Sequence, residues 1–135
     1  MPAAELPELF IDRSVGLIGV PRHFREMWPT TVRTLNEVFG AGKVADAEWL
    51  ARADDEGWVA VCKDDKIRYR PGERELMSRG GLRVFCLTNG NLTRDAMVAW
   101  LAQAHHGLLT QAPQPGPWML GVYARGRTEL LKLYK

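Results

Sequence analysis

Three aspartates of this sequence stand at the boundaries of segments that have the composition of regular elements. Asp12 directly follows the apolar run "LFI", Asp64 follows "WVAVCK", and Asp46 opens the helical pattern "DAEWLARA". Carboxylates that converge repel one another and raise one another's pKa unless a cation lies among them. Carboxylate oxygens suit Mg²⁺ or Mn²⁺, which can orient a phosphate and activate a water molecule. The three aspartates are therefore candidate ligands of a divalent metal ion.

The elements that must position these aspartates follow from composition and periodicity. Segments rich in β-branched and aromatic residues, bounded by turn residues, predict strands at 9–12, 31–35, 58–62, 82–87 and 118–124. Helical patterns separate them at 14–28, at 46–57, at 71–78 and after Thr93. Strands that alternate with helices favour right-handed crossovers, a parallel sheet and helices on both faces.

The length of the chain limits this architecture to one domain. A chain of 135 residues, 46% of them hydrophobic, can bury one compact core and is too short for two ordinary domains. We therefore expect a single α/β domain over residues 1–135. Its predicted form is a three-layer αβα sandwich with a central parallel sheet of about five strands, the last of them at an edge.

Convergence of the aspartates follows from this architecture. In a parallel sheet the carboxyl ends of the strands lie on one edge, so Asp12 and Asp64 should meet there. Asp46 reaches the same edge if the loop before its helix crosses the top of the sheet. Simpler interpretations are that Asp46 caps its helix with Glu48 in the first turn, that Asp12 is a turn residue, and that Asp64 and Asp65 are solvated. The equivalent positions of Asp12 and Asp64 in two βα units favour the site.

Basic residues flank the predicted acidic site. Cationic groups beside an aromatic ring suit the backbone and bases of a single-stranded nucleic acid. The candidate contacts are Arg13, Lys63, Lys66, Arg68, Tyr69 and Arg70. The alternative is a solvated face on which Arg68 and Arg70 pair with Glu73 and Glu75. The net charge of +2 does not by itself indicate a strongly basic nucleic-acid-binding arm.

Other features narrow the class of protein. Cys62 and Cys86 lie in apolar runs, without the spacing of a zinc site or a disulfide scaffold, so reduced core thiols are expected. No run approaches the ~20 apolar residues that span a bilayer, and the first residues lack a leader pattern. We therefore expect a soluble cytoplasmic protein without a membrane segment.

Neighbouring helical side chains such as His105 and His106 point about 100° apart, which favours a helix C-terminal role or exposure over a metal site.

Four segments together resemble a known family. They are "FIDRSVG", "VADAEWLARADDEGW", "KDDKIRYRPGERE" and "VFCLTNGNLT". In this order they are similar to the PIN-like domain family, in particular the short branch of VapC-type toxins from bacterial toxin–antitoxin pairs. The resemblance implies a PIN fold with strand order 3-2-1-4-5 and metal-dependent endoribonuclease cleavage of single-stranded RNA. It also implies that Asp12, Asp46 and Asp64 match the catalytic, metal-binding aspartates, that a small antitoxin is the partner, and that a homodimer can form.

One departure from that family concerns a further acidic residue. Larger PIN nucleases carry it on a helix between the first two aspartate positions, and the stretch between Asp12 and Asp46 is short, so that helix is expected to be missing. Glu48, Glu37 or Asp65 could supply a fourth carboxylate, and Glu48 is included among the candidate metal ligands. The number of metal ions is left open.

Two alternative functions remain. A receiver-like phosphoacceptor domain also has aspartates after the first and third strands and a hydroxyl after the fourth, here Thr88. Such a domain needs an acidic pair after the first strand and a lysine after the fifth, whereas this chain has Asp12-Arg13 and Arg125. The other alternative is a catalytically silent PIN-like binding module, which metal titration would distinguish from an enzyme.

Asp64 and Asp65 should differ in their effect on activity, because side chains alternate between faces along an extended segment. The resemblance to the PIN-like family favours Asp64 as the residue that faces the site. We expect Asp64→Asn to remove Mn²⁺-dependent cleavage of single-stranded RNA without unfolding the protein. Asp65→Asn should keep a substantial part of that activity. An active Asp64→Asn protein would contradict the proposed chemistry, and an inactive Asp65→Asn protein would mean that the chain turns earlier than predicted.

Overall fold

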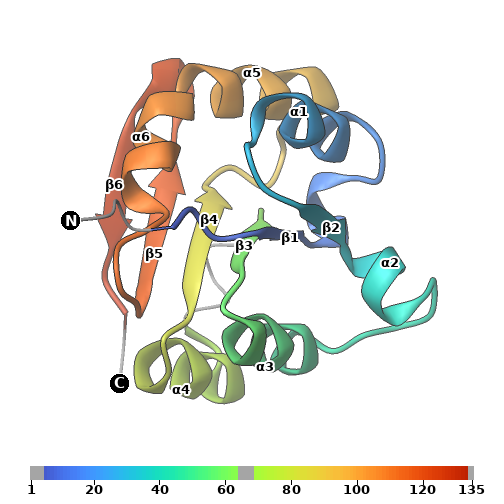
Figure 1. The fold of residues 1–135 in the computed structure, drawn as a ribbon, viewed down its shortest axis with the longest axis vertical. Coiled ribbons are helices and arrows are strands. Elements are labelled where there is room, and N and C mark those ends of the chain that lie inside the picture. The colour runs from blue at the N-terminus through green and yellow to red at the C-terminus, as the bar shows by residue number, and fades with distance from the viewer. Residues whose placement is uncertain (1–4, 64–68, 134–135) are drawn as a thin grey trace.

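Six strands form one sheet in the computed structural model, which describes residues 5–63 and 69–133. They are β1 (Leu9–Ile11), β2 (Val32–Thr34), β3 (Val59–Cys62), β4 (Arg83–Leu87), β5 (Trp118–Val122) and β6 (Thr128–Leu131). Their order is β2-β1-β3-β4-β5-β6, with β1 to β5 parallel and β6 antiparallel to β5 (Figure 1). The predicted α/β fold with a central parallel sheet is confirmed.

The centre of the sheet is formed by strands that are buried on both faces. Every residue of β1, β3 and β5 is buried, and Phe10 and Ile11 of β1 lie opposite Ala60 and Val61 of β3. Strands covered on both sides need no alternation of polar and apolar residues, which explains their continuous apolar runs. Because β1, β3 and β4 run in the same direction, the residues that follow them lie along one edge of the sheet.

Helices cover both faces of the sheet. One face carries α1 (Gly19–Met27), α5 (Arg94–Gln103) and α6 (His105–Gln111), and the other carries α2 (Leu35–Phe39), α3 (Asp46–Glu56) and α4 (Pro71–Arg79) (Figure 1). Two hydrophobic clusters result, one on each side of the sheet. Across 5–63 and 69–133, no helix has both the length and the apolar character needed to cross a membrane.

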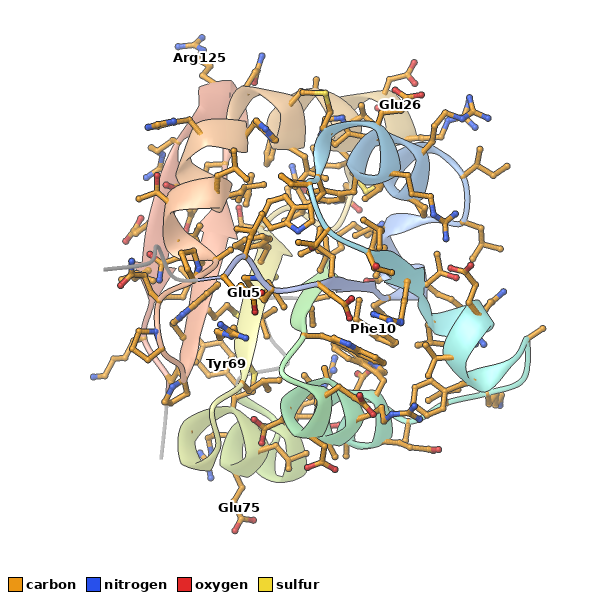
Figure 2. The ribbon with its side chains drawn as sticks, in the orientation of Figure 1. Glu5, Phe10, Glu26, Tyr69, Glu75 and Arg125 are labelled. Carbon is orange, nitrogen blue, oxygen red and sulfur yellow. The ribbon has the colours of Figure 1, made fainter. Side chains whose placement is uncertain are left out.

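Aromatic packing fixes α3 against β1. The Phe10 ring lies on the face of the sheet that α3 covers (Figure 2). Its centroid is 5.8 Å from that of Trp49 and 5.6 Å from that of Trp58, with interplanar angles of 23° and 5°. Phe39 at the end of α2 meets the same ring edge-on at 6.2 Å. The residue two positions before Asp12 is thus the centre of a buried aromatic cluster.

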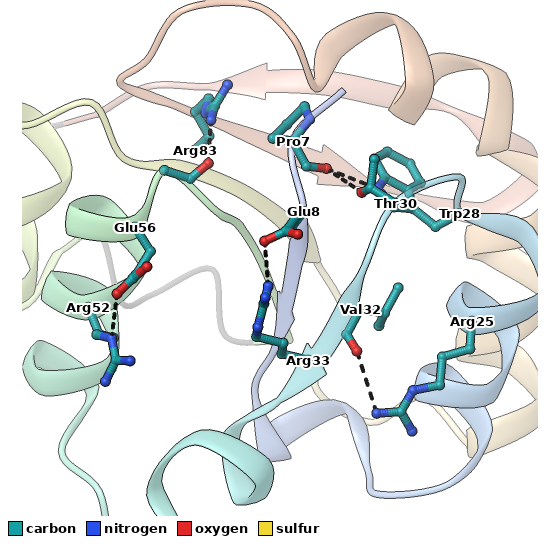
Figure 3. A network of polar contacts seen from close by, with 11 residues as sticks. Pro7, Glu8, Arg25, Trp28, Thr30, Val32, Arg33, Arg52, Glu56 and Arg83 are labelled. Atoms are coloured by element: carbon teal, nitrogen blue, oxygen red, sulfur yellow. Dashed lines mark hydrogen bonds and ion pairs between the residues drawn. The ribbon is translucent and has the colours of Figure 1, made fainter. Parts of the chain in front are cut away.

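The opposite edge, where the parallel strands begin, is held by polar contacts (Figure 3). Arg33 Nη1 lies 2.6 Å from Glu8 Oε1, joining the starts of β1 and β2. The guanidinium groups of Arg33 and Arg52 lie over the Trp58 ring, 5.0 and 5.6 Å from its centroid. These contacts stabilise the amino ends of the strands and lie away from the edge at which the aspartates were predicted to meet.

Two expectations about the sheet are wrong. The strand order differs from 3-2-1-4-5 because the chain forms one strand, β2, between β1 and α3, and β3 then pairs with the other side of β1. The strand β5 is not at an edge because β6 pairs with it. The hairpin turn between them contains Arg125 at φ 63° and Gly126 at φ 76°, within the 3₁₀ segment η3 (Ala124–Gly126). Left-handed backbone of this kind allows a tight reversal of the chain.

The predicted first helix is divided, and two short helices were not predicted. Asp12 caps a 3₁₀ turn, η1 (Arg13–Val15), and Gly16 at φ 89° interrupts the chain before α1. The unpredicted α2 begins with a capping box between Thr34 and Glu37, a signal that is visible in the sequence. Because α5 ends at Gln103, His105 begins α6, and the expected helix C-terminal role is wrong.

Two partly buried histidines, His23 of α1 and His105 of α6, each have one buried ring nitrogen. Neither His23 Nε2 nor His105 Nδ1 has a hydrogen-bond partner within the described part of the chain. Burial lowers the pKa of His23, the charge of His105 lowers it further, and Glu26 acts in the opposite direction. The folded state therefore favours the neutral imidazole of His23.

The stability of the protein should depend on the protonation of His23. The folded pKa of His23 lies below its unfolded value of 6.5. Its contribution to the free energy of unfolding is therefore fully present above pH 6.5 and is lost as the pH falls through the folded pKa. We expect His23→Gln to reduce the loss of unfolding free energy between about pH 7.5 and pH 5, measured by urea denaturation. His106→Gln, at an exposed position of α6, should keep the wild-type pH dependence. The same pH dependence in His23→Gln as in the wild type would contradict this prediction.

Candidate functional site

Asp12 lies immediately after β1 at the carboxyl edge of the sheet. Its backbone N–H donates to Val61 O at 3.0 Å, and its Oδ2 accepts a hydrogen bond from Ser14 N at 3.2 Å. Burial raises the pKa of Asp12, hydrogen bonds from Ser14 lower it, and the charge of Asp46 raises it. The interpretation of Asp12 as a turn residue is thus partly correct, because it caps η1, but its carboxylate also lies within the field of a second carboxylate.

Ser14 joins the ends of the adjacent strands β1 and β3. Its Oγ accepts a hydrogen bond from the backbone N–H of Lys63 at 3.1 Å, while its own N–H donates to Asp12. Lys63 directly follows β3 and is the last described residue before the segment 64–68. The chain therefore enters that segment from a point fixed beside Asp12. Asp64 and Asp65 themselves lie outside the described residues.

Asp46 is the first residue of α3, and its side chain is held by two donors. Oδ1 accepts a hydrogen bond from Trp49 Nε1 at 2.9 Å, and Oδ2 accepts one from Arg70 Nη1 at 3.1 Å. The simpler interpretation of Asp46 as the helix cap is wrong, because the N-cap is Ala45 and no side-chain capping bond forms. The carboxylate instead accepts its hydrogen bonds from the side chains of Trp49 and Arg70.

The other acidic candidates do not join this pair. Glu48 is exposed, and Glu37 accepts hydrogen bonds within the capping box and pairs with Arg25. Within 5–63 and 69–133, no group of three His, Cys, Asp or Glu residues is placed to hold a metal ion. Asp12, Asp46 and Glu48 therefore do not form a three-ligand group. Of the three predicted aspartates, Asp12 and Asp46 are described and the charge of Asp46 raises the pKa of Asp12, while Asp64 lies outside the described residues.

The predicted RNA-binding residues differ in their surroundings. The Arg13 guanidinium turns towards α2, where Nε donates to Asn36 Oδ1 and Nη2 donates to Gly40 O at 2.7 Å. These bonds hold the end of α2 to the turn that follows Asp12.

Of the remaining basic and aromatic candidates, Lys63 follows β3, and Tyr69 and Arg70 directly precede α4. Arg70 pairs with Asp46, Lys63 is partly exposed, and Tyr69 is 46% exposed. Lys66 and Arg68 lie outside the described residues. The alternative pairing of Arg70 with Glu73 or Glu75 is replaced, for its Nη1, by the bond to Asp46.

Two residues that position the site were not singled out from the sequence. Trp49 donates to Asp46 from one turn further along α3, and Ser14 connects Asp12 to Lys63. The i to i+3 spacing of Asp46 and Trp49 is visible in the sequence as a helical neighbour pair. The Ser14 contact to Lys63 joins residues far apart in the chain, so no local pattern indicates it.

Thr88, the hydroxyl of the receiver-like alternative, is engaged in the sheet. Its Oγ1 donates to Val122 O at 3.2 Å, and its N–H donates to the same carbonyl at 3.3 Å. The hydroxyl therefore extends the pairing of β4 with β5.

Comparisons with known proteins give a consistent result. Residues 7–89, more than half of the chain, match the model of a family described as "PIN like domain". The chain is also 29% identical over 123 residues to the protein named "Putative ribonuclease VapC45" of Mycobacterium tuberculosis (strain ATCC 25618 / H37Rv), with 89% of this chain and 88% of that protein covered. No solved structure matches the chain. The matched range contains Asp12, Asp46 and Asp64.

Asp12→Asn should stabilise the protein at neutral pH when no divalent ion is present. The pKa of Asp12 is raised in the folded state. Its contribution to the free energy of unfolding is therefore present below pH 3.8, the unfolded pKa, and is lost as the pH rises through the folded pKa. Asparagine keeps a side-chain oxygen that can accept the bond from Ser14. Chemical denaturation should therefore give Asp12→Asn a higher free energy of unfolding than the wild type at about pH 7, and this difference should disappear near pH 3. Asp55→Asn, at an exposed position of α3, is the matched control, and a variant of Asp12 that is destabilised at both pH values would contradict the prediction.

Proposed function

The chain belongs to the PIN-like domain family, and we propose that it is a ribonuclease of the VapC type that cleaves single-stranded RNA with a divalent metal ion. The partly buried carboxylate of Asp12 directly after β1, on which the charge of Asp46 acts, carries this proposal together with the family match. The two residues are far apart in the sequence, yet the charge of Asp46 is felt at Asp12. Pairs of carboxylates in partly buried surroundings are typical of metal-dependent hydrolytic sites.

The donor set fits a small divalent cation. Asp12 and Asp46 offer carboxylate oxygens, the ligands that Mg²⁺ and Mn²⁺ prefer. Their mutual repulsion and the burial of Asp12 make the pair unfavourable without a cation. We propose Asp64 as the third ligand, supported by the fixed position of Lys63 beside Asp12. Glu48 is a weaker candidate because its side chain is exposed and forms no three-ligand group with Asp12 and Asp46.

The proposed reaction is hydrolysis of a phosphodiester bond in RNA. A bound Mg²⁺ or Mn²⁺ supplies activation of a water molecule and stabilisation of negative charge on the phosphate. Asp12 and Asp46 hold this centre, and Ser14 and Trp49 keep the two carboxylates oriented through the hydrogen bonds described above. We propose that Lys63, Lys66, Arg68 and Arg70 contact the substrate phosphates and that Tyr69 stacks on a base. Arg13 is a weaker candidate because its guanidinium donates to Asn36 and Gly40.

The same proposal includes the biological context of the activity. A VapC-type ribonuclease acts on RNA in the cytoplasm and is blocked by a small antitoxin protein. We propose that such an antitoxin covers the acidic residues or inserts a basic side chain between them. A homodimer is also proposed, from the resemblance to the family alone.

Cleavage of single-stranded RNA should require Mn²⁺ or Mg²⁺ and both described aspartates. Asp12→Asn and Asp46→Asn should each lower the rate by at least about a hundredfold, the scale that well-placed catalytic groups contribute. Gel analysis of a labelled RNA, with and without EDTA, measures the effect, and circular dichroism checks the fold of each variant. Asp55→Asn should retain full activity.

Two outcomes would contradict the proposal. Cleavage that persists in EDTA would exclude the proposed site. Wild-type rates of cleavage by both Asp12→Asn and Asp46→Asn would exclude it as well. Binding of Mn²⁺ and RNA without any cleavage would favour the catalytically silent binding module.

A further inference from the structure

Arg70 connects the start of α4 to the start of α3 through the acidic site. Arg70 is the N-cap residue of α4, and its Nη1 donates to Asp46 Oδ2 at 3.1 Å. Trp49 Nε1 donates to the other oxygen, Oδ1, at 2.9 Å. Both oxygens of Asp46 therefore accept a hydrogen bond from a side chain of this chain, and one of the two donors is positively charged.

The two donors have different consequences for a cation at Asp46. Trp49 is neutral, belongs to the same helix and is 1% exposed, so its bond orients the carboxylate without adding charge. The Arg70 guanidinium carries a full positive charge, which repels a divalent ion, and it donates to one of the two carboxylate oxygens of Asp46. The side chains of Arg70 and Asp46 are 47% and 35% exposed. Exposed ion pairs of this kind contribute little to stability, so another ligand can replace one partner readily.

We infer that Arg70 is an internal counter-ion of Asp46 that competes with the divalent metal ion for this carboxylate. The inference rests on the proposed function, because it assigns a role at the proposed metal site. In the ion pair, Arg70 offsets the charge of Asp46, which otherwise acts on the partly buried carboxylate of Asp12. Loading of the metal ion breaks the pair. The guanidinium keeps its charge at the start of α4, and its fork of donors is well suited to a phosphate of the RNA backbone.

This exchange links metal loading to substrate binding. Arg70 pairs with Asp46 in the unloaded protein and contacts a phosphate of the RNA in the loaded protein. The metal ion and the RNA therefore raise each other's binding affinity by the same factor. Arg70 thus lowers the affinity for the metal ion and raises the affinity of the loaded site for RNA.

The test measures Mn²⁺ binding to the full chain by isothermal titration calorimetry, without RNA. Arg70→Gln removes the charge and keeps hydrogen-bonding capacity, and we expect it to bind Mn²⁺ about three- to tenfold more tightly than the wild type. Arg70→Lys keeps the charge and should remain close to the wild type. The gain in Arg70→Gln should shrink at high salt because ions screen exposed charges.

A matched control is available on α3. Arg52 Nε lies 3.1 Å from Glu56 Oε1, and the two side chains are 45% and 44% exposed, so this pair resembles Arg70 and Asp46 without touching the site. Arg52→Gln should leave the Mn²⁺ affinity unchanged. Equal or weaker Mn²⁺ binding by Arg70→Gln would overturn the inference and leave the proposed function intact. Absence of Mn²⁺ binding in wild type and variant alike would overturn both.

Discussion

The stacking of Phe10 between Trp49 and Trp58 holds the helix α3 to the central strand β1. Phe10 belongs to β1, two residues before Asp12, and Trp49 belongs to α3, three residues after Asp46. The same packing therefore sets the position of one carboxylate relative to the other. Trp49 has a second role, because its indole N–H donates to Asp46 while its ring is buried against Phe10. Aromatic burial and polar positioning of the site are thus combined in one side chain.

The candidate site combines carboxylates that repel one another with bonds that hold them in place. Asp12 is partly buried and caps η1, and Asp46 is more exposed and receives a charged donor. Desolvation makes Asp12 the more costly carboxylate to ionise, whereas Arg70 directly offsets the charge of Asp46. At the other end of the strands, Glu8 and Arg33 instead form an ion pair of opposite charges.

The adjacency of β1 and β3 is essential to this arrangement. Because β3 pairs directly with β1, Ser14 can reach Lys63 and hold the end of β3 beside Asp12. The opposite face of the sheet, covered by α1, α5 and α6, contributes buried apolar contacts and the His23 and His105 pair. Stability on that face and chemistry at the carboxyl edge therefore depend on different residues, so each can be changed experimentally with limited effect on the other.

The sequence alone was sufficient to predict the five parallel strands, the α/β class, the start of α3 at Asp46 and the resemblance to the PIN-like domain family, which is confirmed. These features depend on apolar runs, helix periodicity and motif residues that are close together in the chain. The sequence did not predict the strand order or β6, and it left open whether Asp46 is only a helix cap. It also gave no sign that Arg13 turns towards α2 and Arg70 towards Asp46. Those features depend on packing between elements distant in sequence, where the position of α3 on the sheet determines which charged groups meet.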